Sequence, residues 1–444
     1  MTLRFGTDGV RGPASEFTDA LVVALGQVAA QVLGTSGFVI GRDTRESGER
    51  LETALGVGLS RGGAQPLSMG VVPTPAVAWI CAQRGLPGAV ISASHNPWSD
   101  NGIKFFAAGG RKLSDDLETA LEQALDAVIA RAEAGAETEL VIGIETDVNA
   151  VAEWCNAVAS SVSAVAPMRI VIDCANGAAS SVAPGIFRGL GLDVEVLHAQ
   201  PDGRNINDAC GSTHPGDLQK AVVASGAALG LAFDGDADRL LAVDERGELV
   251  DGDQLIALFA RDLRDRGQLA GDRVVVTVMS NLGFHQAMHH EGVNVVTTTV
   301  GDRYVLDAME SGGFVLGGEQ SGHIIHRDLA TTGDGLLASI VLAQLVRRRQ
   351  EKDGVKFSQL ATSVMHTFPQ VLKNVKVAVR PTDVAQLLAS EIAAEESLLG
   401  ENGRVLVRAS GTEPLIRVMV EAPTAEMANE VADRLVAVAV NKCL

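Results

Sequence analysis

Short runs of β-branched and aliphatic residues alternate with longer helical patterns along most of the chain, and this alternation constrains the fold more than any other feature. Strands are predicted at residues 37–43, 89–92, 169–174, 193–198, 228–234, 273–279 and 294–300. Several of these runs are apolar at consecutive positions, which is typical of strands that helices cover on both faces. Between two of them, Leu117, Leu121, Leu125 and Val128 form an apolar stripe at helical spacing. The pattern predicts an α/β protein with mostly parallel sheets.

The 444 residues are too many for a single hydrophobic core, and the chain divides into four predicted domains. Changes in composition mark boundaries near residues 132–149, 244–253 and 364–374. The predicted domains are residues 1–150, 151–250, 251–366 and 367–444. The first three follow the α/β pattern. The last has the order strand, helix, strand, strand, helix, which predicts a smaller α+β domain.

The charge balance excludes several classes of protein. With 55 acidic and 36 basic residues, the formal net charge is -19, which argues against a nucleic-acid-binding surface. No run reaches the roughly 18 apolar residues that span a membrane, and the N-terminus lacks the layout of a secretion signal. Five cysteines at scattered spacings, without a C-x-x-C pair, indicate buried thiols in a reducing compartment. We therefore expect a cytoplasmic protein.

The segment FDGDADRLLAVDE has the densest arrangement of carboxylates. Asp234, Asp236 and Asp238 follow an apolar run and alternate with small residues. Three carboxylates this close repel one another unless a cation lies between them, and hard oxygen ligands of this kind suit Mg²⁺. A solvated acidic turn is one alternative. A calcium-binding loop is another, because Glu245 fits the D-x-D-x-D-G-x5-E pattern, although Arg239 replaces its glycine. We interpret the segment as a strand–loop–strand magnesium site.

The segment GAVISASHNPWSDNGIKFF places a serine where a buried strand ends. Ser94 follows the predicted strand, and Asn96 and Pro97 then break the chain into a loop. A hydroxyl at this place is a candidate nucleophile, and Lys104 follows on the next apolar run. A serine that only caps a turn is the default alternative. The G-x-S-x-G turn of α/β-hydrolases is absent, so that class fits poorly.

The segment RASGTEPLIR combines two guanidinium groups, two hydroxyls and flexible backbone N–H donors. Guanidinium forks match phosphate geometry, so this loop is a candidate clamp for a dianionic group. Its candidate residues are Arg408, Ser410, Gly411, Thr412 and Arg417. An ordinary hairpin loop with exposed arginines is the alternative.

Two glycine-containing segments add weaker signals. GEQSGH supplies Glu319 and Ser321, which suit the hydroxyl groups of a sugar, and His323, which suits proton transfer. A histidine in such a place is more often a structural hydrogen-bonding residue. RFGTDGVRG supplies Arg4 and Arg11 in a loop suited to contact with phosphate.

Together the segments RFGTDGVRG, SASHNP, DGDADR, GEQSGH and RASGTEP, in this order, resemble the α-D-phosphohexomutase superfamily and most closely its bacterial phosphoglucosamine mutases. The resemblance covers nearly the whole chain. It implies a four-domain architecture, with three α/β domains of mixed sheets and a smaller α+β C-terminal domain around a central cleft. It also implies a cytoplasmic enzyme that binds neither nucleic acid nor membranes, and it allows a homodimer.

The same resemblance implies roles for individual residues. Ser94 would carry a phosphoryl group and, with the three aspartates, bind one Mg²⁺. Catalytic roles would fall to Lys104, Arg11 and His323, and substrate would contact Arg239, Glu319, Ser321, Arg408, Ser410, Gly411, Thr412 and Arg417. The implied reaction interconverts glucosamine 6-phosphate and glucosamine 1-phosphate through a 1,6-bisphosphate, for synthesis of UDP-N-acetylglucosamine. A phosphoglucomutase or phosphomannomutase is the alternative, and a calcium-binding protein is a more distant one.

Overall fold

The computed structural model describes most of the chain, and its described residues form four β-sheets. These residues are 5–6, 9–132, 144–162, 165–377, 383–409 and 415–443. The chain separates into two compact units, one of residues 1–278 with 296–361 and one of residues 279–295 with 362–444. None of the described helices is long and apolar enough to span a membrane.

The first sheet has seven strands in the order β1-β2-β6-β5-β3-β4-β7. The strands are β1 Phe5–Gly6, β2 Gly9–Pro13, β3 Gly37–Arg42, β4 Gln65–Val71, β5 Gly88–Ile91, β6 Asp100–Phe106 and β7 Glu145–Thr146. Strands β5, β3, β4 and β7 are parallel neighbours, whereas β1, β2, β6 and β5 pair in antiparallel fashion. The helices of this part of the chain are α1 Asp19–Leu33, α2 Gly48–Arg61, α3 Thr74–Arg84 and α4 Asp115–Ala132.

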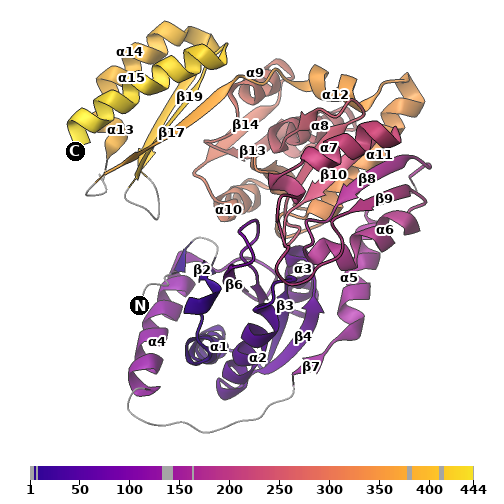
Figure 1. Ribbon diagram of the computed structural model, residues 1–444, viewed down its shortest axis with the longest axis vertical. Coiled ribbons are helices and arrows are strands. Elements are labelled where there is room, and N and C mark those ends of the chain that lie inside the picture. The colour runs from indigo at the N-terminus through magenta and orange to yellow at the C-terminus, as the bar shows by residue number, and fades with distance from the viewer. Residues whose placement is uncertain are drawn as a thin grey trace. The chain divides into compact units, whose positions relative to one another are not determined.

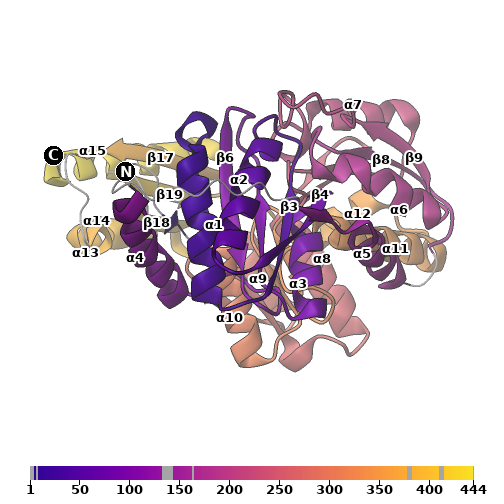
Figure 2. The same ribbon diagram turned by 90° about the horizontal axis from the view of Figure 1, so that it is seen from below.

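Helices α1 and α2 lie side by side at close range (Figure 1, Figure 2). Glycines make this approach possible, because a Cβ atom on Gly58 would lie 2.0 Å from the Val23 carbonyl oxygen. A Cβ atom on Gly26 would lie 2.3 Å from the Leu55 carbonyl oxygen. The predicted stripe on α4 packs in the same core, where Leu121 and Leu125 are buried.

The second sheet has the order β12-β11-β10-β8-β9. Its strands are β8 Arg169–Asp173, β9 Asp193–Leu197, β10 Leu229–Phe233, β11 Leu240–Asp244 and β12 Leu249–Val250, with helices α5 Val148–Ser160, α6 Ala183–Gly189 and α7 Gly216–Ser225. Strands β9, β8 and β10 are parallel, and β10, β11 and β12 are antiparallel. The three aspartates therefore lie in a strand–loop–strand hairpin, as the sequence predicts.

The third sheet has the order β14-β13-β15-β16. Its strands are β13 Arg273–Thr277, β14 Asn294–Thr298, β15 Leu316–Gly318 and β16 Ile324–His326. The helices of this stretch are α8 Gly252–Asp265, α9 Leu282–His290, α10 Asp302–Gly312, α11 Gly335–Asp353 and α12 Phe357–Val364. A capping box formed by Asp251 and Gln254 begins α8, which explains why the helix begins directly after β12.

The second unit contains an antiparallel sheet in the order β17-β19-β18. Its strands are β17 Gln370–Lys376, β18 Arg404–Ala409 and β19 Leu415–Glu421, and its C-terminal helices are α13 Val384–Leu387, α14 Ala389–Leu399 and α15 Ala425–Cys443. Helices α14 and α15 cover one face of this sheet (Figure 1). Valines of β18 and β19 pack there against Val431 and Leu435 of α15. The α+β character predicted for the C-terminal domain is confirmed.

The first three sheets contain both parallel and antiparallel pairs, and the prediction of mostly parallel sheets from the alternating pattern needs this correction. The connections β5–β6, β10–β11 and β15–β16 contain eight, six and five residues. A parallel crossover needs about a dozen residues, so connections this short turn the chain back as antiparallel hairpins. Residues 410–414 similarly connect the antiparallel strands β18 and β19. Each of the four chemistry-bearing segments from SASHNP to RASGTEP thus belongs to a hairpin connection.

Strand β16 ends in a histidine whose titration should be visible in the stability of the protein. His326 is 7% exposed, its ring packs edge-on against Phe259, and burial, with a smaller effect of Arg266, lowers its pKa to about 4. The unfolded chain therefore binds a proton at this residue between about pH 6.5 and pH 4, whereas the folded protein does not. We expect His326 to lower the free energy of unfolding by about 2 kcal/mol between pH 7 and pH 5.

The contribution of His326 to the pH dependence of stability is measured by comparing the wild type with a variant that lacks the imidazole. Denaturant unfolding of the wild type and of His326→Phe at pH 7 and pH 5 should show a smaller acid loss in the variant. His214→Gln, at an exposed histidine, is the control and should titrate like the wild type. Equal acid losses in the wild type and in His326→Phe would contradict the buried, neutral state of His326.

Candidate active site

Ser94 stands at the centre of the candidate site. Its side-chain hydroxyl donates a hydrogen bond of 2.6 Å to Asp234 Oδ2, although 140 positions separate the two residues. Both side chains are buried. Ser94 has a φ of 53°, in the left-handed region that non-glycine residues rarely adopt. Such strain persists only where neighbouring groups fix the backbone, and it is found most often at functional sites.

Two side chains from outside the Ser94 loop fix this backbone. Arg45 Nη2 donates to the carbonyl oxygens of Ser94 at 3.1 Å and Asn96 at 2.6 Å. Asn207 Nδ2 donates to the same two oxygens at 2.9 and 3.0 Å. Within the loop, the backbone N–H of Ser94 donates to Ser92 Oγ at 2.9 Å. The Ser94 hydroxyl is therefore held in one position before any ligand arrives.

Arg45 forms an ion pair with Asp43, and both side chains are buried. Removing only one partner of such a pair leaves an uncompensated buried charge. We expect Arg45→Met to lower the free energy of unfolding by about 3–5 kcal/mol in denaturant titrations.

The double variant Asp43→Asn/Arg45→Met should recover part of that loss, because no charge then remains at the site. Arg50→Met is the control, since Arg50 pairs with Asp19 at the surface and such a pair contributes at most about 1 kcal/mol. A loss in Arg45→Met as small as that in Arg50→Met would contradict the structural role of the buried pair.

The carboxylates of Asp234, Asp236 and Asp238 form a compact set of possible metal ligands. All three are buried, and one oxygen atom of each lies within 4.8 Å of the others. Asp236 Oδ1 and Asp238 Oδ1 are buried without a hydrogen-bond partner, which is costly for carboxylate oxygens. A divalent cation would satisfy both atoms. The residues therefore fit a hard, oxygen-preferring ion such as Mg²⁺.

Burial and charged neighbours shift the pKa values of Asp234 and Asp238 in opposite directions. Burial, reinforced by the charges of Asp238 and Asp236, raises the pKa of Asp234 to about 8. Burial acts in the same direction on Asp238, but Lys104, His323 and Arg239 outweigh it and hold the pKa well below its usual range. The basic groups around the loop thus stabilise the charged form of Asp238 more than that of Asp234.

Lys104 lies on β6 and reaches the aspartate loop from the first sheet. Its Nζ atom is 2.7 Å from Asp236 Oδ2 and 3.5 Å from Asp238 Oδ2. Thr74, at the start of α3, donates its hydroxyl to Asp236 Oδ2 at 2.6 Å. With one oxygen of Asp236 occupied in this way, the carboxylate has a fixed orientation, and Oδ1 remains directed to a ligand.

Two arginines line the same region. Arg239 Nε lies 4.0 Å from Asp234 Oδ2 and 3.9 Å from Asp238 Oδ1, and these carboxylates raise the pKa of Arg239 in spite of its burial. Burial, together with the charges of Arg239 and Arg11, lowers the pKa of His95 to about 4. His95 is therefore a neutral neighbour of Ser94. Arg11 and Arg239 thus place positive charge near His95.

His323 lies between two carboxylates. Its Nδ1 atom is 3.7 Å from Asp238 Oδ2, and its Nε2 atom is 3.2 Å from Asp302 Oδ2. Burial would lower the pKa of His323, but the charges of Asp302 and Asp238 outweigh it and the pKa is raised. The backbone N–H of Gly333 also points at Nε2, at 3.0 Å. The protonated ring can donate to Asp302, and the neutral ring can accept from Gly333, so both protonation states have a partner.

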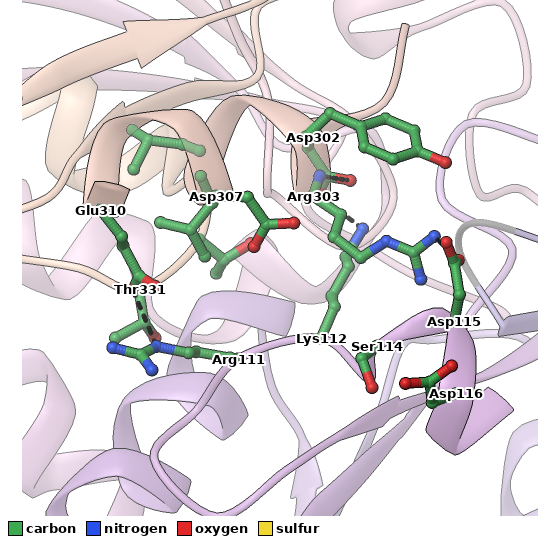
Figure 3. Close-up of a pocket in the computed structure, with 14 residues that line it drawn as sticks. Arg111, Lys112, Ser114, Asp115, Asp116, Asp302, Arg303, Asp307, Glu310 and Thr331 are labelled. Atoms are coloured by element: carbon green, nitrogen blue, oxygen red, sulfur yellow. Dashed lines mark hydrogen bonds and ion pairs between the residues drawn. The ribbon is translucent and has the colours of Figure 1, made fainter. Parts of the chain in front are cut away.

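Asp302 connects His323 to a cavity of about 450 Å³. Lys112 Nζ lies 2.5 Å from Asp302 Oδ2. Figure 3 shows Arg111 and Lys112 facing the same space as residues of α10. Arg111 pairs there with Glu310, and Arg303 pairs with acidic residues of α4. Lys112 thus holds Asp302, the partner of His323, at the edge of this cavity.

Glu319 and Ser321 lie in the β15–β16 connection. Ser321 Oγ donates to Glu319 Oε2 at 3.3 Å, and Glu319 Oε1 accepts from the backbone N–H of Gly301 at 3.1 Å. The charge of Glu319 also acts on Arg239, which brings this loop into the electrostatic environment of the aspartates. An acceptor and a hydroxyl in contact with each other suit a polyhydroxylated ligand.

The predicted phosphate clamp is described in part. Arg408 and Arg417 are directly opposite each other on β18 and β19. Burial and the adjacent charge of Arg417 lower the pKa of Arg408, so an anion at this place would relieve the repulsion between the two guanidinium groups. The predicted residues Ser410, Gly411 and Thr412 lie outside the described residues.

The calcium-loop alternative does not fit the structure. Glu245, which would be its last ligand, accepts hydrogen bonds from the backbone N–H and hydroxyl of Ser358 at 3.0 and 2.5 Å. Its carboxylate is thus used to hold the start of α12. The flanking elements are strands β10 and β11 rather than helices.

Several residues of the site escape sequence reasoning. Asp43 is the last residue of a predicted strand and Arg45 lies just beyond it, at the edge where α/β proteins bind ligands, and this was an available signal. Thr74, Asn207 and Asp302 carry no such signal. Each acts through contacts with residues far away in the chain, and no local pattern encodes those contacts.

Four family models match the chain. They are the three alpha/beta/alpha domains of phosphoglucomutase/phosphomannomutase, domain I at residues 2–131, domain II at 148–247 and domain III at 251–368, and the C-terminal domain at 372–438. Together they match far more than half of the sequence.

Curated relatives match over nearly their whole length. A phosphoglucosamine mutase of Rhodococcus opacus is 49% identical, and the match covers 97% of this chain and 98% of the relative. A phosphoglucosamine mutase of Carboxydothermus hydrogenoformans is 50% identical, with 98% of each chain covered.

Solved structures share the fold. A phosphoglucomutase/phosphomannomutase family protein of Burkholderia thailandensis has a TM-score of 0.80 at 24% identity, with 99% of this chain and 98% of that chain covered. N-acetylphosphoglucosamine mutase of Aspergillus fumigatus, solved with GlcNAc-6P and magnesium, has a TM-score of 0.69 at 18% identity, with 99% and 96% covered. By its sequence and its fold, the chain belongs to the phosphoglucomutase/phosphomannomutase family and, within it, to the phosphoglucosamine mutases.

Proposed function

We propose that the protein interconverts glucosamine 6-phosphate and glucosamine 1-phosphate through a phosphorylated Ser94 and a 1,6-bisphosphate. One observation carries the proposal: the Ser94 hydroxyl is in hydrogen-bond contact with a buried carboxylate triad that fits a divalent cation. The names of the relatives, phosphoglucosamine mutases of about the same length, support the choice of sugar. The product would serve the synthesis of UDP-N-acetylglucosamine.

Asp234, Asp236 and Asp238 would hold Mg²⁺ together with an oxygen of the phosphoryl group on Ser94. Bound there, the ion would neutralise part of the charge on the group that is transferred. The other requirements fall on the side chains of the chain itself. Arg45 and Asn207 hold the Ser94 backbone, so that the hydroxyl oxygen keeps its position as it gains and loses the phosphoryl group.

Proton and charge transfer are assigned to the basic residues. When the sugar hydroxyl attacks the phosphoryl group, it must lose a proton, and His323, flanked by Asp238 and Asp302, is proposed to receive it. Lys104, Arg11 and Arg239 would compensate the negative charge that develops on the transferred group.

The remaining residues would bind the sugar phosphate. Glu319 and Ser321 are proposed to bind ring hydroxyl groups. Arg408 and Arg417, with Ser410, Gly411 and Thr412, are proposed to bind the phosphate that is not being transferred. A bisphosphate that turns over in the site exchanges its two phosphates between these places, after which the second phosphate returns to Ser94. This sequence of steps converts one monophosphate isomer into the other without net hydrolysis.

The function is tested with the full chain, Mg²⁺, glucosamine 6-phosphate and a trace of the 1,6-bisphosphate. ³¹P NMR should show glucosamine 1-phosphate at equilibrium with the 6-phosphate and no accumulation of inorganic phosphate. Intact-mass measurement with a peptide map should find a phosphoryl group on Ser94. Release of inorganic phosphate without formation of the 1-phosphate would show that the protein is a phosphatase and not a mutase.

The preferred sugar is tested in the same assay. We expect kcat/KM for the glucosamine phosphate to exceed that for glucose and mannose phosphates by at least about tenfold. A higher value for either hexose would favour the phosphoglucomutase or phosphomannomutase alternative. Light scattering on the same sample tests whether the protein forms the homodimer that the resemblance allows.

A further inference from the structure

A second group of metal-ligand side chains lies in the second sheet, apart from the aspartate triad. It consists of Asp173 at the end of β8, His198 directly after β9 and Cys210 before the turn at Gly211–Thr213. One ligand atom of each lies within 4.8 Å of the others. We propose that Asp173, His198 and Cys210 form a second metal site, which takes a thiophilic divalent transition metal such as Zn²⁺ or Co²⁺.

The orientation of His198 carries the argument. Its Nδ1 atom is buried and makes no well-aligned hydrogen bond, although Asp173 Oδ2 lies 3.0 Å away. Its Nε2 atom lies 3.8 Å from Asp217 Oδ2. A metal-binding histidine commonly directs one ring nitrogen to the metal and the other to a carboxylate, which fixes the tautomer. In His198, Nδ1 faces the proposed ligands and Nε2 faces Asp217.

Backbone hydrogen bonds hold the Asp173 carboxylate in place. Asp173 Oδ1 accepts from the N–H of Ala175 at 2.9 Å, and Oδ2 accepts from the N–H of Gly211 at 3.0 Å. The latter bond ties the carboxylate directly to the residue that follows Cys210. His198 has a φ of 47°. Asp173 and Cys210 are fully buried, whereas the side chain of His198 is 27% exposed, so a metal would enter from the His198 side.

The ligand chemistry selects the class of metal. A thiolate, an imidazole and one carboxylate oxygen suit Zn²⁺ and Co²⁺ and do not suit Mg²⁺, which prefers oxygen ligands. Three protein ligands leave one position of a tetrahedral metal for water. The aspartate triad contains no sulfur, so the two sites would differ in the metals they prefer.

A nucleophilic role for Cys210 fits less well. Burial, followed by the charge of Asp173, raises the pKa of Cys210 to about 12, so the thiol is protonated and unreactive at neutral pH. Metal binding would form a metal–sulfur bond and release the thiol proton to solvent. The affinity of the site should therefore rise with pH.

The site would be coupled to the Ser94 loop. Asn207 lies three positions before Cys210 and donates to the carbonyl oxygens of Ser94 and Asn96. Its backbone N–H donates to the carbonyl oxygen of Ala175, two positions after Asp173. The segments that carry two of the proposed ligands thus also hold the loop of the active site.

Co²⁺ provides a direct test, because a cobalt–thiolate bond produces a charge-transfer absorption that an oxygen-only site lacks. The full-length protein, reduced and with Mg²⁺ in excess, is titrated with Co²⁺. We expect a thiolate-to-cobalt band that saturates at one Co²⁺ per chain, is lost on addition of Zn²⁺, and strengthens with pH. Absence of the band in the wild type overturns the proposal without recourse to any variant.

Variants identify the residues that give rise to the absorption band. Cys210→Ser should abolish it, His198→Gln should weaken Co²⁺ binding by at least about tenfold, and Asp217→Asn should weaken it less. Cys155→Ser, at a half-buried cysteine on α5, is the matched control and should keep the band. Circular dichroism checks that each variant is folded. A band that survives in folded Cys210→Ser belongs to another thiol and overturns the assignment.

Discussion

Ser94→Ala should lower mutase activity by at least about 10⁴-fold while leaving the protein folded. The expected loss is large because the substitution removes the only proposed carrier of the phosphoryl group. The hydroxyl donates a hydrogen bond to Asp234, and the backbone of the loop is held by Arg45 and Asn207 through carbonyl oxygens that alanine retains. Steady-state assay with glucosamine 6-phosphate and the 1,6-bisphosphate measures the effect.

Ser99→Ala is the matched control, since Ser99 is exposed in the same connection between β5 and β6. It should leave turnover within about twofold of the wild type, as surface substitutions away from a site usually have small effects. Thermal unfolding should confirm that Ser94→Ala is folded. If a folded Ser94→Ala protein kept a turnover within tenfold of the wild type, Ser94 would not be the carrier of the phosphoryl group.

Asp236→Asn should weaken Mg²⁺ binding by at least about 100-fold and reduce activity at fixed Mg²⁺ accordingly. The aspartate accepts hydrogen bonds at Oδ2 from both Lys104 and Thr74. An asparagine that keeps its oxygen toward these donors turns its NH₂ group toward the metal position. If it instead turns the oxygen toward the metal, the NH₂ group faces the Lys104 ammonium. Neither orientation satisfies all the partners that the carboxylate satisfies.

Isothermal titration calorimetry with Mg²⁺ measures the affinity, and activity against Mg²⁺ concentration measures the functional consequence. Asp208→Asn is the charge control, because Asp208 is an exposed aspartate of the second sheet's loops. It should change neither curve appreciably. Equal Mg²⁺ dependence in the wild type and in Asp236→Asn would show that Asp236 is not a ligand.

Sequence reasoning finds the candidate side chains because each hairpin concentrates them in a few consecutive residues. Asp234, Asp236 and Asp238 occupy one six-residue connection, and Ser94 follows its strand by a short distance. Strand composition likewise predicts the α/β layers. It does not predict the direction of the strands that follow the short connections, because an antiparallel strand such as β11 has the same apolar character that a parallel strand would have.

The supporting residues are harder to predict because their partners are distant in the chain. Thr74 contacts a residue 162 positions away, and Asn207 contacts residues 113 and 111 positions away. Nothing in the residues around Thr74 or Asn207 specifies these partners. Arg45 shows the intermediate case, since its strand-end position suggests a site although its two carbonyl partners cannot be read from the local pattern.

The bonds that join Ser94 to Asp234 and Lys104 to Asp236 also bear on how the enzyme is made. Lys104 leaves the ribosome well before the aspartates, which are about 130 residues further along the chain. A nascent or truncated chain that ends before residue 234 lacks the carboxylates that compensate this lysine in the mature protein. These ion pairs can therefore form only after both the segment with Lys104 and the segment with the aspartates have been synthesised and have packed together. Prematurely terminated products should remain open to proteases at the β5–β6 connection.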